Sequence, residues 1–120
     1  MNEVQLVINN IKNNNVAKDE LVHFLDSHNI LIKANAIFQI VKLKIDDDIV
    51  IQKLAKLAQN AEEEPKVIGL YNNSHFALAA LSWLETENSL EKFEGIVNGL
   101  QPDKYSTLQN LIEERPYLYL

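Results

Sequence analysis

Hydrophobic residues recur at intervals of three and four along most of the chain, the spacing that places them on one side of an α-helix. Turn-forming stretches rich in Asn, Ser, Gly, Pro or acidic residues separate the periodic segments. The pattern predicts seven helices, at residues 4–11, 19–25, 30–44, 46–60, 74–84, 89–100 and 103–114. Residues 67–71 fit either a helical turn or a short strand, and residues 62–65 fit either a charged loop or the first turn of a new element. The chain is therefore expected to be all-α.

The sequence also predicts which residues cap or end several helices. The acidic run 46–48 is expected to cap the fourth helix and to complement its dipole. Ser74 is the expected cap of the fifth helix, and Ser89 opens the sixth in a loose capping-box sequence. Pro116 should end the last helix, before an apolar tail at residues 117–120. We expect this tail to fold back as a cap on the fold, with docking on a partner as the alternative.

A shift of about 43 residues superimposes one part of the chain on another. It aligns Asn29 with Asn72, Ala34 with Ala77, Ala36 with Ala79, Phe38 with Leu81 and Val41 with Leu84, and then Val50 with Phe93, Leu54 with Val97 and Leu57 with Leu100. Self-similarity at such a period is typical of solenoids, in which stacked helix pairs bury each other's faces. The aligned alanines are small enough to let neighbouring helices approach closely.

The segment 32–38, followed by the acidic turn and a second apolar helix, resembles a HEAT repeat, and residues 74–81 look like a second copy. The resemblance covers about residues 29–101. Lys33 matches the basic position of the pattern, whereas the second copy has His75 and Phe76 there.

This resemblance implies an all-α fold in the form of a short right-handed α-solenoid, with about three antiparallel helix pairs and a C-terminal helix. A generic helical bundle is the alternative arrangement. The implied organisation is one HEAT-like domain over residues 1–120, with an atypical N-terminal pair at 1–28, clear pairs at 29–61 and 62–101, and a C-terminal cap at 102–120. Atypical terminal repeats are expected in solenoids, because one of their faces meets water.

Composition limits the possible chemistry. The chain has 120 residues, 47% of them hydrophobic, which suits one domain with its own core. It has no cysteine, which excludes disulfides, thiolate zinc sites and a cysteine nucleophile. Neither a secretory leader nor a bilayer-spanning stretch is visible in the sequence, so we expect a cytoplasmic protein without a membrane partner.

Candidate catalytic and metal-binding residues are sparse. His23 and Asp26 share a helix face with His28 just beyond, but a metal site needs three or four convergent ligands. The acidic runs 46–48 and 62–64 lack the alternating ligands and central glycine of a calcium loop. No phosphate-binding glycine loop and no nucleophile elbow is present in the sequence. We therefore expect no cofactor, no metal and no enzymatic activity.

Charge is distributed unevenly along the sequence. The first 60 residues hold seven acidic and seven basic side chains, whereas the second 60 hold ten and four, and the net charge is -6. Such a balance disfavours direct nucleic-acid binding and favours a basic protein partner, with simple solubility as the alternative explanation. The predicted partner-binding residues are Glu62, Glu63, Glu64, Glu85, Glu87, Glu91 and Glu94, together with the aromatic residues Tyr105 and Tyr117.

HEAT-like solenoids are mostly protein-binding scaffolds. A small acidic member without cysteine looks like a bacterial immunity protein, which implies that it neutralises a basic toxin, expected to be a nuclease, by occluding its active site. The alternative is a small HEAT-like adaptor or regulatory subunit without a toxin partner. A repair enzyme of the alkylation-glycosylase kind shares this helical architecture, but the single arginine, Arg115, and the acidic second half disfavour it.

Overall fold

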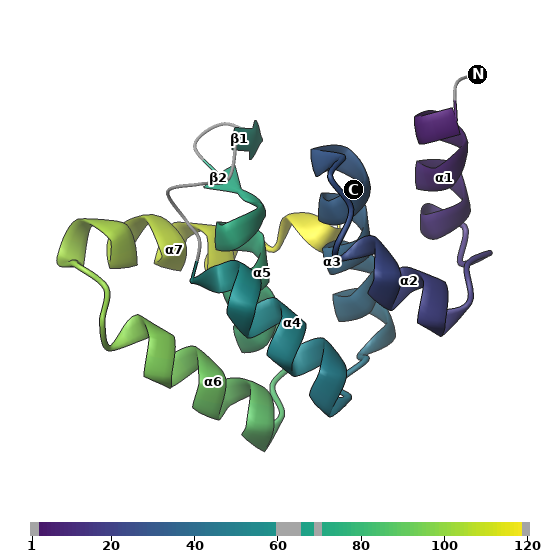
Figure 1. Cartoon of the computed structure of the whole chain (residues 1–120). Coiled ribbons are helices and arrows are strands. Elements are labelled where there is room, and N and C mark those ends of the chain that lie inside the picture. The colour runs from purple at the N-terminus through teal and green to yellow at the C-terminus, as the bar shows by residue number, and fades with distance from the viewer. Residues whose placement is uncertain (1–2, 60–65, 69–70, 119–120) are drawn as a thin grey trace.

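The computed structural model describes residues 3–59, 66–68 and 71–118. Within these ranges the protein contains seven α-helices, so the all-α prediction is confirmed (Figure 1). They are α1 (Glu3–Lys12), α2 (Lys18–Phe24), α3 (Ile30–Leu43), α4 (Asp48–Ala58), α5 (Asn73–Trp83), α6 (Glu87–Val97) and α7 (Pro102–Glu114), followed by the 3₁₀ helix η1 (Pro116–Leu118).

Within the ambiguous stretch 67–71, the described residues Val67, Ile68 and Tyr71 lie in short strands and not in a helical turn. Strands β1 (Lys66–Ile68) and β2 (Tyr71–Asn72) pair antiparallel, with Lys66 opposite Asn72 and Ile68 opposite Tyr71. Val67 and Ile68 are β-branched, which favours the extended conformation over a helical turn. The segment 62–65, for which a loop or a new element was expected, lies outside the described residues.

Helix α5 lies at the centre of the fold because it is apolar on nearly every side. Nine of its eleven residues are buried. Helices α3 and α7 pack on α5, with α1 beyond α3, while α4 and α6 pack both on α5 and on each other (Figure 1). Helix α2 also packs on α3.

Helices α3 and α5 lie side by side and run in the same direction. At their first turns, the Asn73 side chain donates a hydrogen bond of 3.0 Å to the Ile30 carbonyl. At their last turns, Lys44 Nζ donates to the Trp83 carbonyl at 3.3 Å. Because Asn73 and Ile30 are 43 residues apart, the shift seen in the sequence corresponds to the step from one helix to its parallel neighbour.

The residues that this shift aligns have the same local roles. Asn29 caps α3 by accepting hydrogen bonds from the backbone of Leu31 and Ile32, and Asn72 caps α5 in the same position. Ala36 and Ala79 are both fully buried, as close approach of parallel helices requires.

Helix α4 has its main packing surface on α5 and not on α3, the helix with which the sequence pairs it. The short connection after α3 turns at Lys44, which has a left-handed backbone with φ 56°. After this turn, α4 packs mainly on α5. The right-handed solenoid and the HEAT relationship remain predictions.

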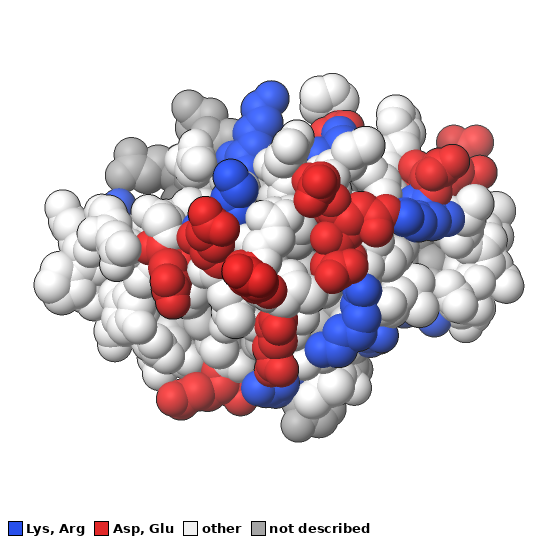
Figure 2. Space-filling view, turned by 90° about the horizontal axis from the view of Figure 1, so that it is seen from below, with Lys and Arg blue, Asp and Glu red and all other residues white. Residues whose placement is uncertain are grey.

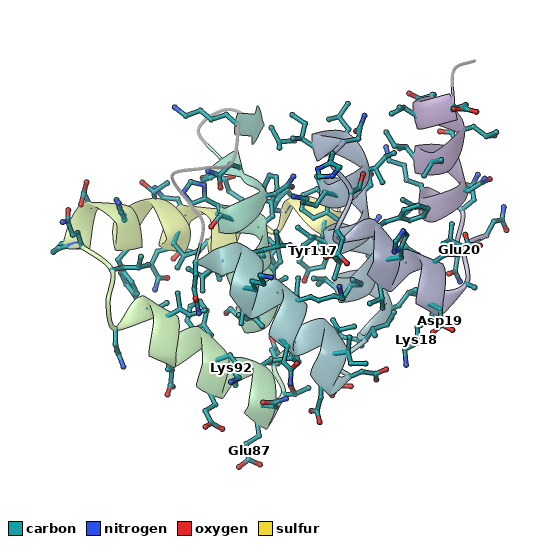
Figure 3. All side chains as sticks on the ribbon, viewed as in Figure 1. Lys18, Asp19, Glu20, Glu87, Lys92 and Tyr117 are labelled. Carbon is teal, nitrogen blue, oxygen red and sulfur yellow. The ribbon has the colours of Figure 1, made fainter. Side chains whose placement is uncertain are left out.

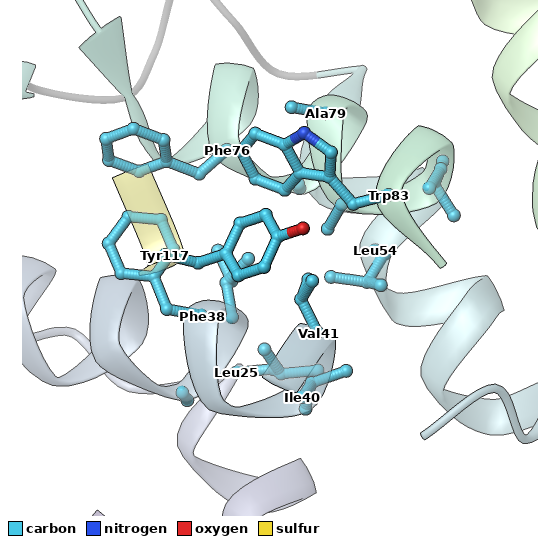
Figure 4. Packing of buried hydrophobic residues seen from close by; sticks show 14 of the residues in the cluster. Leu25, Phe38, Ile40, Val41, Leu54, Phe76, Ala79, Trp83 and Tyr117 are labelled. Carbon is cyan, nitrogen blue, oxygen red and sulfur yellow. The ribbon is translucent and has the colours of Figure 1, made fainter. Parts of the chain in front are cut away.

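The C-terminal segment closes the core. Phe38 and Phe76 pack edge to face with ring centroids 4.8 Å apart, and Trp83 and Tyr117 pack at the same separation (Figure 4). Trp83 Nε1 also donates a hydrogen bond of 3.0 Å to the Ile112 carbonyl. The described part of the tail therefore folds back as a cap, whereas residues 119–120 lie outside the described residues.

Two predicted helix caps need correction. The cap of α5 is Asn72, and Ser74 is instead buried, where its hydroxyl donates a hydrogen bond of 2.9 Å to the Ala58 carbonyl. The cap of α6 is Thr86, and Ser89 is the third helical residue of its capping box. Both helices begin earlier than the periodicity indicates, because apolar spacing marks a buried face and not the first turn. Asp47 occupies the cap position of α4 without a side-chain capping bond.

The capping box of α5 predicts a pH-dependent stability. Nδ1 of His75 accepts a hydrogen bond of 3.0 Å from the Asn72 backbone N–H, which a protonated imidazole could not do. Burial lowers the pKa of His75 below its usual 6.5, and the positive charges of Lys104 and Lys66 lower it further. The unfolded chain therefore binds a proton at His75 more readily than the folded protein does. The contribution of His75 to folding stability is complete above pH 6.5, and it is lost as the pH falls toward the pKa of His75 in the folded state.

Thermal melting between pH 7.5 and 5 measures this effect against His75→Gln, which keeps a capping-box side chain without titrating. We expect the wild type to lose more stability than the variant as the pH falls. Equal losses of stability in the two proteins would contradict the role of neutral His75 as a hydrogen-bond acceptor in the capping box.

Candidate protein-binding surface

Three glutamates form a row along the outer side of α6. Glu87, Glu91 and Glu94 are spaced by four and three residues, which places them on one helix face, and all three are exposed. Thr86 fixes the start of the helix through its capping box. Figure 3 shows Glu87 projecting away from the body of the protein. Lys92 is the one basic residue of this helix.

The first half of the chain extends this row. Nδ2 of Asn88, on α6, donates a hydrogen bond of 3.1 Å to Oδ1 of Asp48, at the first residue of α4. Its neighbour Asp47 forms an ion pair with Lys18, at the start of α2. The hydrogen bond with Asp47 raises the pKa of Lys18. Side-chain contacts thus connect the first turns of three helices.

We call the resulting surface the acidic face. It comprises the exposed carboxylates Asp19, Glu20, Asp46, Asp47, Asp48, Glu87, Glu91 and Glu94. Figure 2 shows acidic side chains spread over this side of the molecule, with basic side chains among them. Five of the eight carboxylates come from the first half of the sequence, which has no net charge of its own.

The other predicted partner-binding residues are placed differently. Glu85 is exposed just before α6, in a left-handed conformation with φ 57°. Tyr105 is exposed on α7, a helix that packs mainly on α5. Tyr117 is 6% exposed against Trp83, so the prediction that it contacts a partner is corrected to a core role. Residues 62–64 lie outside the described part of the chain.

Sequence reasoning missed two features of this surface. The run 46–48 was assigned only to capping, and its proximity to α6 depends on the packing of α4 on α6. The second feature is a groove beside α4, where Lys53 and Lys56 line one hollow with residues of the α2–α3 connection. The sequence could have indicated this groove through the spacing of Lys53 and Lys56, because residues three apart share one face of a helix.

Three further observations concern metal binding, membrane spanning and the histidines. The described residues contain no group of three His, Asp or Glu side chains arranged to hold a metal ion. None of the described helices has the length and apolar character needed to cross a bilayer. His75 serves the capping box of α5, so one of the three histidines has a structural role.

A glycine on α6 provides a test of local stability beside the acidic face. Gly95 lies inside the helix, and an added Cβ would meet no other atom within 4 Å. Gly95→Ala should therefore stabilise the protein by about 0.5–1 kcal/mol, because alanine restricts the unfolded chain without a clash. Urea unfolding followed by circular dichroism measures the change. A destabilised variant would show that α6 is not helical at this position.

Comparison with known proteins gives no relative from which to transfer a function. No protein-family model, no curated protein and no solved structure matches this chain.

Proposed function

We propose that this protein is an immunity protein that binds a basic toxin domain, of the nuclease class, and occludes its active site. The observation that carries the proposal is the acidic face, whose eight exposed carboxylates lie at the starts of α2 and α4 and along α6, with side-chain contacts connecting the three helices. A nuclease must present cations to the phosphates of its substrate. A surface of clustered carboxylates competes for those cations.

The contacts within the acidic face support this role. The Asn88–Asp48 hydrogen bond and the Lys18–Asp47 ion pair connect the three helices that carry the carboxylates. Residues supported by packed helices keep their relative positions, which lowers the entropy lost on binding. Complementary charge also accelerates encounter with a basic partner and disfavours acidic ones.

Capture of the partner tests the proposal. The immobilised protein is exposed to the product of the neighbouring reading frame, expressed with its catalytic residues disabled, and separately to the source cell's lysate. We expect capture of a basic toxin domain and inhibition of the intact toxin in an activity assay. Capture of a basic domain without inhibition, or of a cellular complex only, would instead support the alternative of an adaptor or regulatory subunit.

A further inference from the structure

We propose that the protein has a second binding site, which takes an acidic segment of a partner protein that also carries an apolar side chain. The site is the groove between α4 and the connection from α2 to α3. It goes beyond the proposed function, because it selects the opposite charge from the acidic face and involves different residues.

The groove has the size of a binding site. Its main hollow has a volume of about 480 Å³, which falls within the range of roughly 300–1,000 Å³ typical of ligand pockets. A second hollow of about 400 Å³ adjoins it and shares Asp26, Ser27 and His28. Two adjoining hollows along one connection suit an elongated segment better than a compact ligand.

Among the described residues that line the main hollow, the charged side chains are mainly basic. They are Lys33, Lys53 and Lys56, with Asp26 as the acidic member of this described set. Asp26 is paired with Lys53. In a protein with a net charge of -6, this excess of lysines over carboxylates among the described lining residues favours an anionic partner.

Part of the groove's lining is apolar. Leu25, Leu57 and Ile49 supply it: Leu25 is buried, Leu57 is half-buried, and Ile49 is 63% exposed. An apolar side chain of the partner would cover Ile49 while its acidic neighbours met the ammonium groups. Inorganic phosphate or a polyanion could use the lysines but would leave the apolar lining exposed. The combination therefore selects an acidic peptide segment with an apolar residue.

Fluorescence anisotropy with three labelled peptides tests this proposal on the full chain. The probe has the sequence Glu-Asp-Leu-Phe-Asp-Glu, and the two comparison peptides replace either Leu-Phe by Ser-Ser or the acidic residues by lysine. We expect the first peptide to bind with a dissociation constant of about 100 µM, as suits a short segment in an open groove. Both comparison peptides should bind at least tenfold more weakly.

Matched variants locate the binding. Lys56→Glu and Ile49→Ser should each weaken binding of the first peptide by about tenfold. Their controls, Lys92→Glu on α6 and Leu118→Ser on η1, change an exposed cation and a 60% exposed leucine outside the groove and should leave binding unchanged. Circular dichroism verifies that all four variants are folded. Three results would overturn the proposal: the Ser-Ser peptide binds as tightly as the Leu-Phe peptide, the lysine peptide binds more tightly, or none of the peptides binds.

Discussion

Trp83→Ala is expected to destabilise the protein by about 3–5 kcal/mol, the cost of removing a large aromatic side chain from a packed core. Trp83 is 1% exposed, and its ring packs on Tyr117 with centroids 4.8 Å apart. Its indole N–H also supplies the hydrogen bond to the Ile112 carbonyl. The truncation therefore leaves a cavity and a partly buried carbonyl acceptor without its donor. Against a typical total of about 5–15 kcal/mol, this loss would leave a marginally stable chain.

Urea unfolding followed by circular dichroism measures the loss, because Trp83 is the protein's single tryptophan and its fluorescence disappears with it. Trp83→Phe keeps an aromatic ring but removes the N–H donor, so we expect a smaller loss of about 1–2 kcal/mol. Tyr105→Ala, at a 37% exposed position, is the surface control. A loss in Trp83→Ala no larger than that of the control would contradict the role of the C-terminal cap.

Local patterns predicted the helices well because each helix buries a face that recurs with the helical period. In α3, the positions Ile37, Ile40 and Val41 are fully buried, and their spacing is visible in the sequence without any tertiary information. The short strands were ambiguous, because an apolar stretch as short as Val67 and Ile68 matches both periods. Pairing with β2 stabilises the extended conformation of β1. This pairing depends on the tertiary fold, which the local sequence pattern does not show.

The repeat also contained spatial information. The alignment paired Asn29 with Asn72, and the structure shows that both are N-caps, although Ser74 was the cap predicted for α5. Both helix starts have backbone N–H groups from which an Asn side chain can accept hydrogen bonds. The alignment could not specify that α4 packs mainly on α5. The direction of a helix after a short connection depends on the backbone conformation at residues such as Lys44. The spacing of apolar residues does not predict that conformation.

The candidate binding surface was only partly predictable for the same reason. Glu87, Glu91 and Glu94 share a face through their spacing alone. The addition of Asp48 and Asp47 depends on the packing of α4 against α6, and in the sequence these residues are about 40 positions from Glu87. Tyr117 was misplaced because an aromatic residue suits a protein interface and a core equally well.

Charge reversal on α6 is expected to produce the largest effect on binding. The triple variant Glu87→Lys, Glu91→Lys and Glu94→Lys should weaken binding of the captured basic partner by about 100-fold, since reversed charges opposite cations turn attraction into repulsion. The three side chains are exposed, so the variant should stay folded. Calorimetric titration at low and high salt measures the change. The wild-type affinity should fall as salt is added, whereas the variant should lose this dependence.

A matched control separates the acidic face from net charge. Glu3→Lys, Asp103→Lys and Glu113→Lys reverse three exposed carboxylates on α1 and α7, so this variant carries the same net charge as the first one without altering the acidic face. It should lose less than about fivefold in affinity, because charges beyond a Debye length of about 8 Å are largely screened at physiological salt. Equal losses in the two variants would mean that the partner responds to overall charge and not to the arrangement on α6. In that case the row of glutamates on α6 contributes to binding only through the net charge of the protein, and the acidic face is not the recognition surface.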